Sequence, residues 1–315
     1  MEQSTTQQHQ QLTRNMNDDD ESSPNKTRRK RIVLIRHGRT HMNEYLSKPG
    51  SRWGDANFTD IFKEEEQLEL YRDSPLSRDG IEQAQNLCET LSSTCLEQQE
   101  QGGAILNNVE IVVSSPLTRT LQTTELALLP HLQGSSSEQQ QGRRVRRQVP
   151  IIALPLATER LYLISDHGSS TMDLRKRFPF VDFETEHGDD EADEWWFQVV
   201  PDKQQGDKGE EEEKKKKKKK KQSSSSPPLE SFRYVEESNY VEWRPNEEGQ
   251  TYACHGEPDF HFCSRMVALS DWLANRKEST ICLVAHWGVL EWLTGGDDFQ
   301  NCEMKVIDFD QVRRR

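Results

Sequence analysis

A short apolar run at residues 32–35 is followed directly by Arg36, His37 and Gly38. The run has the length and β-branched content of a buried strand, so these three residues lie where a strand ends and the chain turns. In open α/β sheets, ligands bind at that edge. A neutral histidine nitrogen can act as a nucleophile, arginine offers a planar fork that matches a phosphate, and glycine permits close approach. The pattern is typical of phosphate chemistry, but a tripeptide alone is too short to be specific.

Three later apolar runs also end in residues that can do chemistry. Arg119 comes just after 112–116, Glu159 just after 151–154, and His286 just after 281–285. Core packing does not explain why four successive runs should each deliver such a side chain at the carboxyl end. The spacing therefore predicts one site, assembled at one edge of a sheet.

In their order along the chain, these blocks resemble the histidine phosphatase superfamily, also called the phosphoglycerate-mutase-like family. The resemblance rests on RHGRTHMN at 36–43, PLSRDGIEQA at 75–84, SSPLTRTLQT at 114–123, and then Glu159 and His286. It implies a three-layer αβα sandwich with a mostly parallel central sheet, and an enzyme that acts on phosphomonoesters. The matching blocks extend over roughly residues 31–309.

His37 is the predicted nucleophile, and its attack on phosphorus would give a phosphohistidine. Phosphoryl transfer spreads negative charge over three oxygens, so it depends on well-placed donors. We expect Arg36, Arg119 and His286 to bind these oxygens, Asn43 to add a neutral hydrogen bond, and Gly38 to permit their approach.

The leaving alkoxide must be protonated, which none of the arginines can easily do, so a carboxylic acid is needed. Glu159 is the predicted proton donor because it follows the third strand, and the resembled family places its acid here too. The plainer interpretation of Glu159 is an ion pair with Arg160 or another surface group. Glu125 and Glu291 are the rival acids.

The residues favour a phosphatase, with two alternatives. A phosphoglycerate mutase would use the same phosphohistidine, but the mutases of the resembled family carry Glu-Arg-x-Tyr-Gly after the acid, and this chain has Leu163 in place of the glycine. A non-catalytic binder of phosphorylated ligands is the less favoured alternative, since every charged and nucleophilic position is present.

The composition predicts one folded domain with polar insertions. Hydrophobic residues make up 32% of the chain, and the mean hydropathy is −0.94. The polar excess is local, so we expect a disordered tail at 1–29 and a single domain at 30–312 with low-complexity insertions at 133–148 and 202–228.

The expected partner is a small phosphorylated metabolite or another phosphomonoester. A net charge of −13 argues against nucleic-acid binding, and no apolar run is long enough to cross a membrane. The absence of a secretory start and the six cysteines without a CxxC pair indicate the cytoplasm. The lysine run at 214–221 leaves a nuclear location open. No metal or other cofactor is expected, because arginines and imidazoles neutralise the phosphate.

Alternating apolar patterns predict the elements that position these side chains. We expect strands near 31–36, 109–114, 149–155, 280–285 and 304–309. Helices are expected over 78–100, 117–129 and 258–276. The apolar residues at helical spacing that mark the inner face of the first are Ile81, Ala84, Leu87, Leu91 and Leu96, and those of the last are Phe262, Met266, Leu269, Trp272 and Leu273. Strands that alternate with helices indicate a mostly parallel sheet covered on both faces.

Overall fold

The computed structural model describes residues 29–51, 70–92, 106–132, 149–183, 195, 232–235, 240–243, 257 and 259–314. Its strands are β1 (Arg31–Arg36), β2 (Ile111–Ser114), β3 (Ile151–Ala153), β4 (Phe232–Val235), β5 (Tyr240–Trp243), β6 (Thr280–Ala285) and β7 (Met304–Asp308). Its α-helices are α1 (His41–Leu46), α3 (Arg78–Ser92), α6 (Thr118–Thr123), α7 (Leu129–Leu132), α8 (Thr171–Arg177), α10 (Asp259–Asn275) and α11 (Trp287–Thr294). A π-helical turn, η3 (Thr124–Leu128), joins α6 to α7, and 3₁₀ turns are η5 (Pro155–Ala157), η6 (Ile164–Asp166) and η9 (Phe309–Gln311).

One five-stranded sheet forms the centre of the molecule, with the order β3-β2-β6-β1-β7. β1, β2, β3 and β6 run parallel to one another, whereas β7 pairs antiparallel with β1. The mostly parallel sheet predicted from the sequence is therefore confirmed. β3 is shorter than the predicted 149–155, because the chain turns into η5 at Pro155, which has no N–H to continue a ladder.

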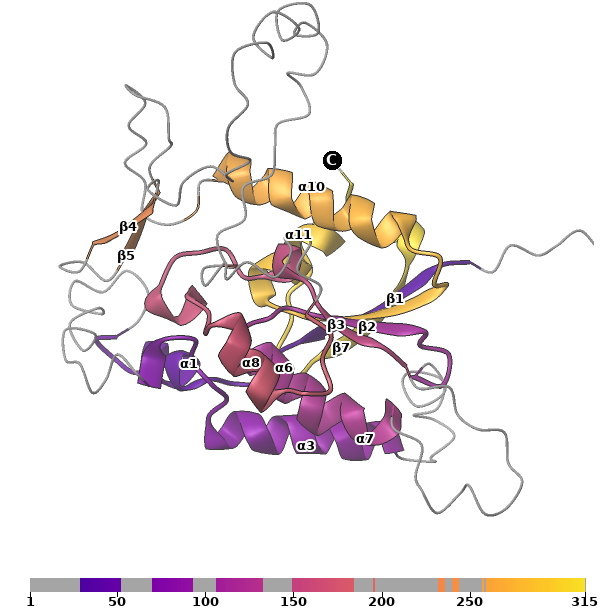
Figure 1. Cartoon of the computed structure of the whole chain (residues 1–315), viewed down its shortest axis with the longest axis horizontal. Coiled ribbons are helices and arrows are strands. Elements are labelled where there is room, and N and C mark those ends of the chain that lie inside the picture. Colours follow the sequence, from indigo (N-terminus) through magenta and orange to yellow (C-terminus); the bar gives the residue numbers. More distant parts are fainter. Residues whose placement is uncertain are drawn as a thin grey trace, which may run out of the picture.

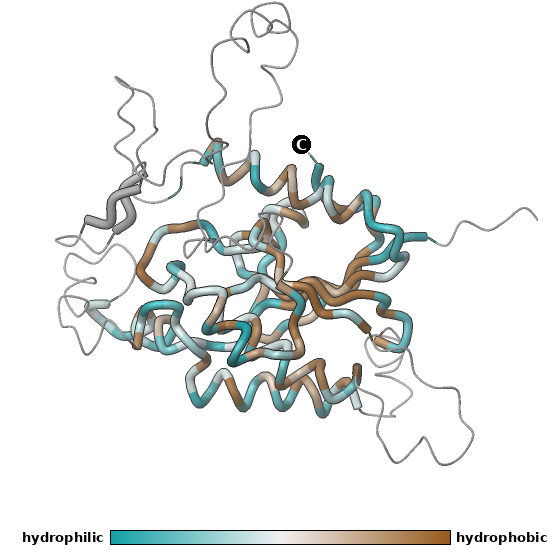
Figure 2. The backbone as a smooth tube through the Cα atoms, in the orientation of Figure 1, coloured by the Kyte–Doolittle hydropathy of each residue, from teal (hydrophilic) through white to brown (hydrophobic). Residues whose placement is uncertain are grey.

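Helices cover both faces of this sheet, which confirms the three-layer architecture (Figure 1). The strand β1 shows how the sequence achieves it, because successive side chains point to opposite faces. Val33 and Ile35 pack with the cluster under α3 and η3, while Ile32 and Leu34 pack with the cluster under α10 and α11. The strands are the most hydrophobic part of the described chain, as Figure 2 shows.

The inner face of α3 differs from the prediction at one position. Ala84, Leu87 and Leu91 are buried as expected, but Ile81 is 37% exposed. Gly80 takes the inward position instead, since a Cβ there would lie 1.9 Å from the carbonyl oxygen of Arg39. The backbone of Arg39 thus approaches α3 more closely than any side chain would allow.

The helix predicted over 117–129 forms, but a π-helical turn interrupts it. α6 passes into the π-helical turn η3 before α7 completes it. Such turns are frequent at functional sites. The sequence pattern could not show this turn, because its apolar spacing differs little from that of a continuous helix.

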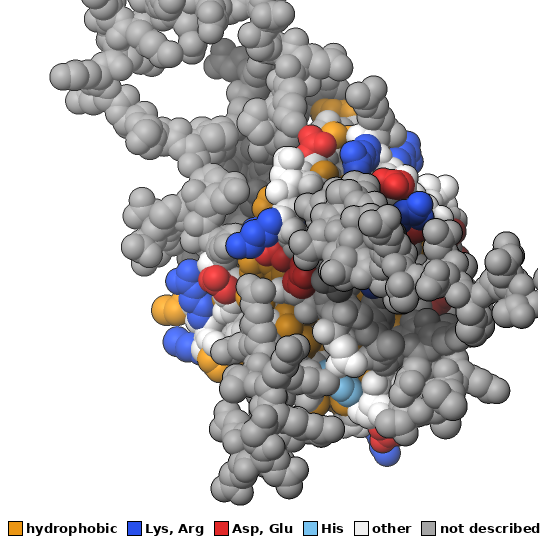
Figure 3. Space-filling view, turned by 90° about the vertical axis from the view of Figure 1, so that its right-hand side faces the viewer, with side chains coloured by type: hydrophobic (Ala, Val, Ile, Leu, Met, Phe, Trp, Pro, Cys, Tyr) orange, Lys and Arg blue, Asp and Glu red, His pale blue; other side chains and the backbone are white. Residues whose placement is uncertain are grey.

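Several sequence expectations lie outside the described residues. They include most of the tail at 1–29, the insertions at 133–148 and 202–228, and the end of the helix predicted to reach residue 100. The antiparallel hairpin β4–β5 was not predicted. Charged side chains of both signs are interspersed on the face shown in Figure 3. Among the described residues, we find no helix with the length and apolar character needed to span a membrane.

Candidate active site

Two histidines meet because their strands are neighbours. Arg36 at the end of β1 pairs in register with Ala285 at the end of β6, so His37 and His286 are the next residues on adjacent strands. The amide N–H of His37 also donates to the carbonyl of Ala285 at 3.1 Å. The two imidazole centroids lie 5.2 Å apart, and both side chains are buried. The sequence prediction that these residues share a site is consistent with this geometry.

Arg119 reaches the same place from β2, which lies on the other side of β6. Ser115 donates its amide N–H to Val284, after which the chain turns into α6. Arg119 is the second residue of α6, so it lies within the first turn of that helix. Its Nε donates to Nδ1 of His286 at 3.3 Å.

This contact fixes the proton position on His286. A guanidinium can only donate, so Nδ1 of His286 accepts and its single proton lies on Nε2. That Nε2–H donates to the hydroxyl of Ser115 at 2.8 Å. Burial, together with the nearby Arg119 guanidinium, holds the pKa of His286 well below its usual value, so the ring is neutral.

His37 carries its proton on the opposite nitrogen. Its Nδ1 lies 2.7 Å from the carbonyl oxygen of Gly38, which can only accept, so Nδ1 is the protonated atom. The lone pair is therefore on Nε2. Burial and the positive charges of Arg119 and Arg36 hold the pKa of His37 well below its ordinary value. The structure thus presents a neutral imidazole with one unprotonated nitrogen, which is the form a nucleophile needs.

Two residues that the sequence analysis missed hold the guanidinium of Arg119. Nη1 donates to the carbonyl of Ser165 at 2.6 Å, and Nη2 donates to Oδ1 of Asp166 at 3.0 Å. Asp166 and Arg119 form a buried ion pair. No motif or periodic pattern surrounds these residues, so the sequence carried no signal for them. With Nε on His286, these bonds use three of the five guanidinium N–H groups.

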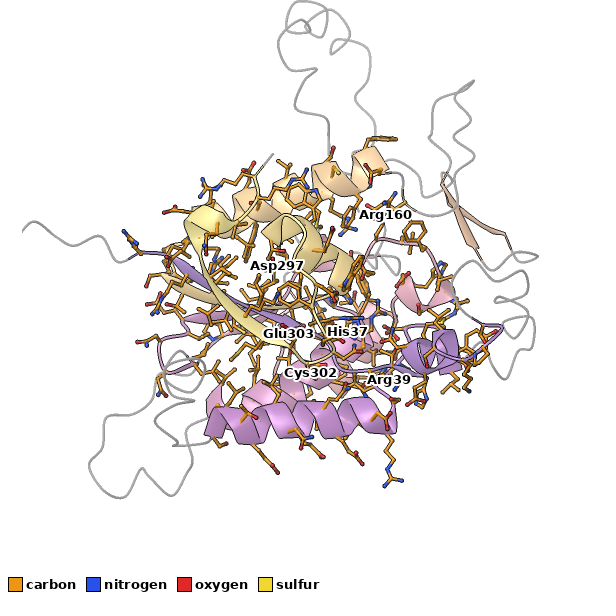
Figure 4. All side chains as sticks on the ribbon, turned by 180° about the vertical axis from the view of Figure 1, so that it is seen from behind. His37, Arg39, Arg160, Asp297, Cys302 and Glu303 are labelled. Atoms are coloured by element: carbon orange, nitrogen blue, oxygen red, sulfur yellow. The ribbon has the colours of Figure 1, made fainter. Side chains whose placement is uncertain are left out.

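Arg36 lies beside the loop that precedes β7. Its Nη1 donates to the carbonyl of Phe299 at 2.5 Å, while its buried Nε has no hydrogen-bond partner among the described residues. The amide N–H of Cys302 donates to the carbonyl of Arg36, and the side chain of Asn301 donates to that of His37. Figure 4 shows Cys302 and Glu303 next to His37. A bound oxyanion would complete the hydrogen bond of an orphaned guanidinium N–H.

Glu159 lies on the loop after η5 and faces the start of α11. Its carboxylate accepts the backbone N–H of Arg160 at 2.9 Å and that of Gly288 at 3.3 Å. Burial raises the pKa of Glu159, and the carboxylate of Asp166 adds to this, while the two N–H groups and Arg119 oppose it. Burial lowers the pKa of Arg36, and the negative charge of Glu159 opposes this shift. A carboxyl group with a raised pKa beside two arginines suits a proton donor.

Glu159 does not form the expected ion pair with Arg160, because the guanidinium of Arg160 pairs with Asp259 instead. Of the rival acids, Glu125 lies in η3, where its charge acts on Arg177 of α8. Glu291 lies in the middle of α11, past the end that faces Glu159. The geometry therefore favours Glu159.

Gly38 and Asn43 have local roles that the sequence did not indicate. The amide N–H of Gly38 donates to the hydroxyl of Thr123, so it is engaged within the protein. A Cβ on Gly38 would lie 2.7 Å from the carbonyl of Gly80, which explains the glycine by packing. The side-chain oxygen of Asn43 accepts from the amide of Thr40 in the cap of α1. Their predicted contact with phosphate stays a prediction.

Two cysteines and two histidines, the residue types that bind zinc, lie close together in the sequence: Cys254, His255, His261 and Cys263. Only the last two are among the described residues. His261 binds Glu257 through its Nδ1 at 2.7 Å. Among the residues that the structure describes, no three His, Cys, Asp or Glu side chains are placed to hold a metal ion.

Comparison with known proteins gives one sequence match and several structural ones. Residues 32–136 match the model of the histidine phosphatase superfamily (branch 1). No curated protein matches the chain. Solved structures similar to it include an alpha-ribazole phosphatase from Shigella flexneri, with 18% identity, a TM-score of 0.37, and coverage of 88% of this chain and 90% of that one. A phosphoglycerate mutase from Thermus thermophilus has 16% identity, a TM-score of 0.36, and coverage of 90% and 96%.

The matched segment contains Arg36, His37, Asn43 and Arg119, which are the residues that carried the resemblance in the sequence. Members of this superfamily are phosphatases and mutases. His286 and Glu159 come later in the chain than this segment, and the fold brings both of them close to Arg119. The chain is therefore similar to the histidine phosphatase superfamily over residues 32–136.

Proposed function

We propose that this protein is a phosphatase that hydrolyses phosphomonoesters through a phosphohistidine on His37, with Glu159 as the proton donor. The observation that carries the proposal is the state of His37. Its Nδ1 proton is held by the carbonyl of Gly38 at 2.7 Å, it is neutral, and it lies beside Arg119 and His286. A merely structural histidine would not need two arginines around it.

In the first step, Nε2 of His37 attacks the phosphorus atom and the bond from phosphorus to the ester oxygen breaks. Arg36 and Arg119 stabilise the charge that spreads over the three other oxygens. His286 keeps Arg119 oriented. The Nε2–H of His286 donates to the hydroxyl of Ser115 in the structure, and His286 would donate this same N–H to a phosphate oxygen. The leaving oxygen takes its proton from the carboxyl group of Glu159.

In the second step, water attacks the phosphohistidine and the phosphorus–nitrogen bond breaks. The carboxylate of Glu159, left ionised by the first step, takes a proton from the water molecule. His37 regains its Nε2 lone pair, Glu159 regains its proton, and inorganic phosphate leaves. Throughout both steps, Nδ1 of His37 keeps its proton and donates it in the hydrogen bond to the carbonyl of Gly38.

Arg160 supports hydrolysis over the mutase alternative. A mutase must hold the carboxylate of its substrate, and Arg160 with Tyr162 would be the residues to do so. In the structure, Arg160 donates from Nε to the carbonyl of Glu257 and from Nη1 to Asp259, and its guanidinium lies 4.9 Å from the ring centroid of Tyr162. These contacts direct two of the five guanidinium N–H groups of Arg160 at Glu257 and Asp259, which favours hydrolysis.

The experiment is a substrate screen followed by trapping of the intermediate. Sugar phosphates, phosphoglycerates, nucleotides and phosphopeptides are tested for release of inorganic phosphate. The best substrate is then quenched rapidly without acid, and peptides are mapped by mass spectrometry. We expect phosphate on His37, its loss with activity in His37→Ala, and no change in His131→Ala, a matched substitution in α7. A label on Ser114, Ser115 or a carboxylate, together with an active His37→Ala variant, would refute the proposal.

A further inference from the structure

One arginine outside the site is among the largest fully buried side chains of the described chain. Arg265 lies in α10 and is 2% exposed. Its Nε and Nη2 donate to the two carboxylate oxygens of Glu257, at 3.0 and 2.6 Å. His261 lies on the same carboxylate. Burial alone would raise the pKa of Glu257, but Arg265 and His261 lower it to about 2, so the pair is ionised.

The remaining donors of Arg265 reach across to the loop that carries Glu159. Nη1 donates to the carbonyls of Leu156 and Thr158, at 3.0 and 2.7 Å. Nη2 donates to the carbonyl of Glu159 itself at 3.2 Å. One guanidinium thus binds three backbone carbonyls within four residues.

Glu257 secures the same loop from its far side. Its amide N–H donates to the carbonyl of Leu161, and its Oε2 lies 3.4 Å from the amide nitrogen of Leu161. Residues 158–161 lie between η5 and η6, outside any helix or strand. Buried carbonyls in such a segment need partners from elsewhere in the protein. The pair of Arg265 and Glu257 supplies them on both sides of Glu159.

The choice of arginine is significant. A planar fork with five N–H groups can bind one carboxylate and three carbonyls together, whereas the three hydrogens of a lysine ammonium radiate from a single atom. A simple ion pair with Glu257 would not require this fork. The donors that Glu257 leaves over are the ones directed at residues 156–159.

We propose that Arg265 is a positioning residue for the proton donor: it fixes the backbone of residues 156–159 so that the carboxyl group of Glu159 meets the leaving oxygen. The inference rests on the proposed function of the His37 site. A displacement of about 1 Å in a catalytic group can cost on the order of 10²-fold in rate. The loss should appear only where a proton must be donated.

The test compares an alkyl phosphate, which needs the acid, with p-nitrophenyl phosphate, whose leaving group hardly needs one. Arg265→Lys keeps the charge opposite Glu257 but cannot bind all the carbonyls. We expect kcat on the alkyl ester to fall by about 10- to 100-fold, and kcat on the aryl ester to fall by less than about 3-fold. In a Glu159→Gln background, Arg265→Lys should cause no further loss, because the two residues act as a unit.

A second variant guards against misfolding. Arg265→Met combined with Glu257→Leu removes both charges and leaves neither buried alone. The ratio of alkyl to aryl rates does not depend on how much of the protein is folded, so both variants remain informative. The matched control is Arg276→Lys, which alters an arginine just beyond the end of α10 that pairs with Glu278. This control should leave the ratio unchanged.

Equal losses on both esters, or losses that add to those of Glu159→Gln, would overturn the inference. If the unmodified protein forms phosphohistidine and Glu159→Gln is selective for alkyl esters while both Arg265 variants keep a normal ratio, only the role of Arg265 fails. If the unmodified protein forms no phosphohistidine with any substrate, the proposed function fails first.

Discussion

The proton positions on two buried imidazoles define the chemistry of the site. His37 is protonated on Nδ1 by its contact with the carbonyl of Gly38, and His286 is protonated on Nε2 by its contact with Arg119. The ring of His37 is left with an unprotonated, nucleophilic Nε2, and the ring of His286 with a single N–H. Burial and the nearby Arg119 hold the pKa of each well below its usual value, so both rings are neutral at neutral pH.

Glu159→Gln tests the proton donor, because it keeps the shape of the side chain and removes its proton. We expect hydrolysis of alkyl phosphates to slow by about 10²–10⁴-fold, the usual range for a positioned acid. p-Nitrophenyl phosphate should be affected far less. Steady-state rates on the two esters measure the contrast, with Glu291→Gln as the matched control. Equal losses on both esters would move the role to another carboxylate.

The pH dependence follows from the raised pKa of Glu159. A general acid works while it is protonated, so a higher pKa extends its working range upward. The ratio of alkyl to aryl kcat/KM should therefore fall as the pH rises through the pKa of Glu159. Because the phosphate groups of the two esters ionise at different pH values, each rate is first divided by the fraction of its substrate in the reactive ionisation state. A ratio that stays constant from acidic to alkaline pH would contradict the assignment.

At the scale of elements, the placement of Arg119 depends on how α6 begins. Oδ1 of Asp73 accepts the amide N–H of Thr118, and Oδ2 accepts its hydroxyl at 2.6 Å. Oδ2 also accepts the amide and hydroxyl of Ser169. Asp73 therefore ties the start of α6 to the segment whose Ser165 and Asp166 hold the guanidinium of Arg119. Its backbone has a φ of 43°, a conformation that Asp and Asn tolerate better than most residues.

Asp73→Asn is expected to loosen this connection. Asparagine tolerates the same backbone conformation, but it turns two acceptors into one acceptor and one donor group. Buried partners would lose their hydrogen bonds, each at about 1–3 kcal/mol, so the free energy of unfolding should fall by about 2 kcal/mol or more. Denaturant unfolding measures this, and competitive inhibition by vanadate should weaken as Arg119 shifts.

Asp79→Asn is the matched control, because Asp79 forms a solvent-exposed ion pair with Arg39. Exposed pairs contribute about 0–1 kcal/mol. If the two variants were equally stable, Asp73 would have no special role in anchoring α6.

At the scale of the whole molecule, the sheet gathers the site. β1, β6 and β2 are adjacent and parallel, so Arg36, His37, His286 and Arg119 arrive at one edge from three strands. Glu159 arrives from beyond β3, at the far side of the sheet from β7. The helices α10 and α11 on one face and α3 and α6 on the other enclose this edge (Figure 1).

The polar segments should be dispensable for this arrangement. We expect a protein without residues 1–28, and with 203–228 replaced by a short Gly/Ser linker, to keep its activity and its melting temperature nearly unchanged. Segments of such composition cannot bury enough apolar surface to stabilise a fold. Phosphate release and thermal unfolding of the full and shortened chains measure this. A large loss of activity on a good substrate would show that one of these segments acts at the site.

The sequence by itself determined which strands end in residues that can do chemistry, and it carried the similarity to the histidine phosphatase superfamily over residues 32–136. Buried strands and short motifs are local patterns, and the side chains at strand ends can be read from their position. On the predicted apolar face of α10, Trp272 is only partly buried, and the other four residues are buried: Phe262, Met266, Leu269 and Leu273. The prediction that Ile81 lies on the inner face of α3 was wrong, because the close approach of Arg39 to Gly80 is a tertiary contact.

Only the tertiary structure decided how the site is held. Ser165, Asp166, Glu257 and Arg265 act on Arg119 and Glu159 from positions with no local motif, because their partners are backbone carbonyls and side chains far away in the chain. The same is true of the proton on each histidine, which depends on a neighbour rather than on the residue type. Local sequence records which groups can do chemistry, and only packing determines which atom of each group faces the substrate.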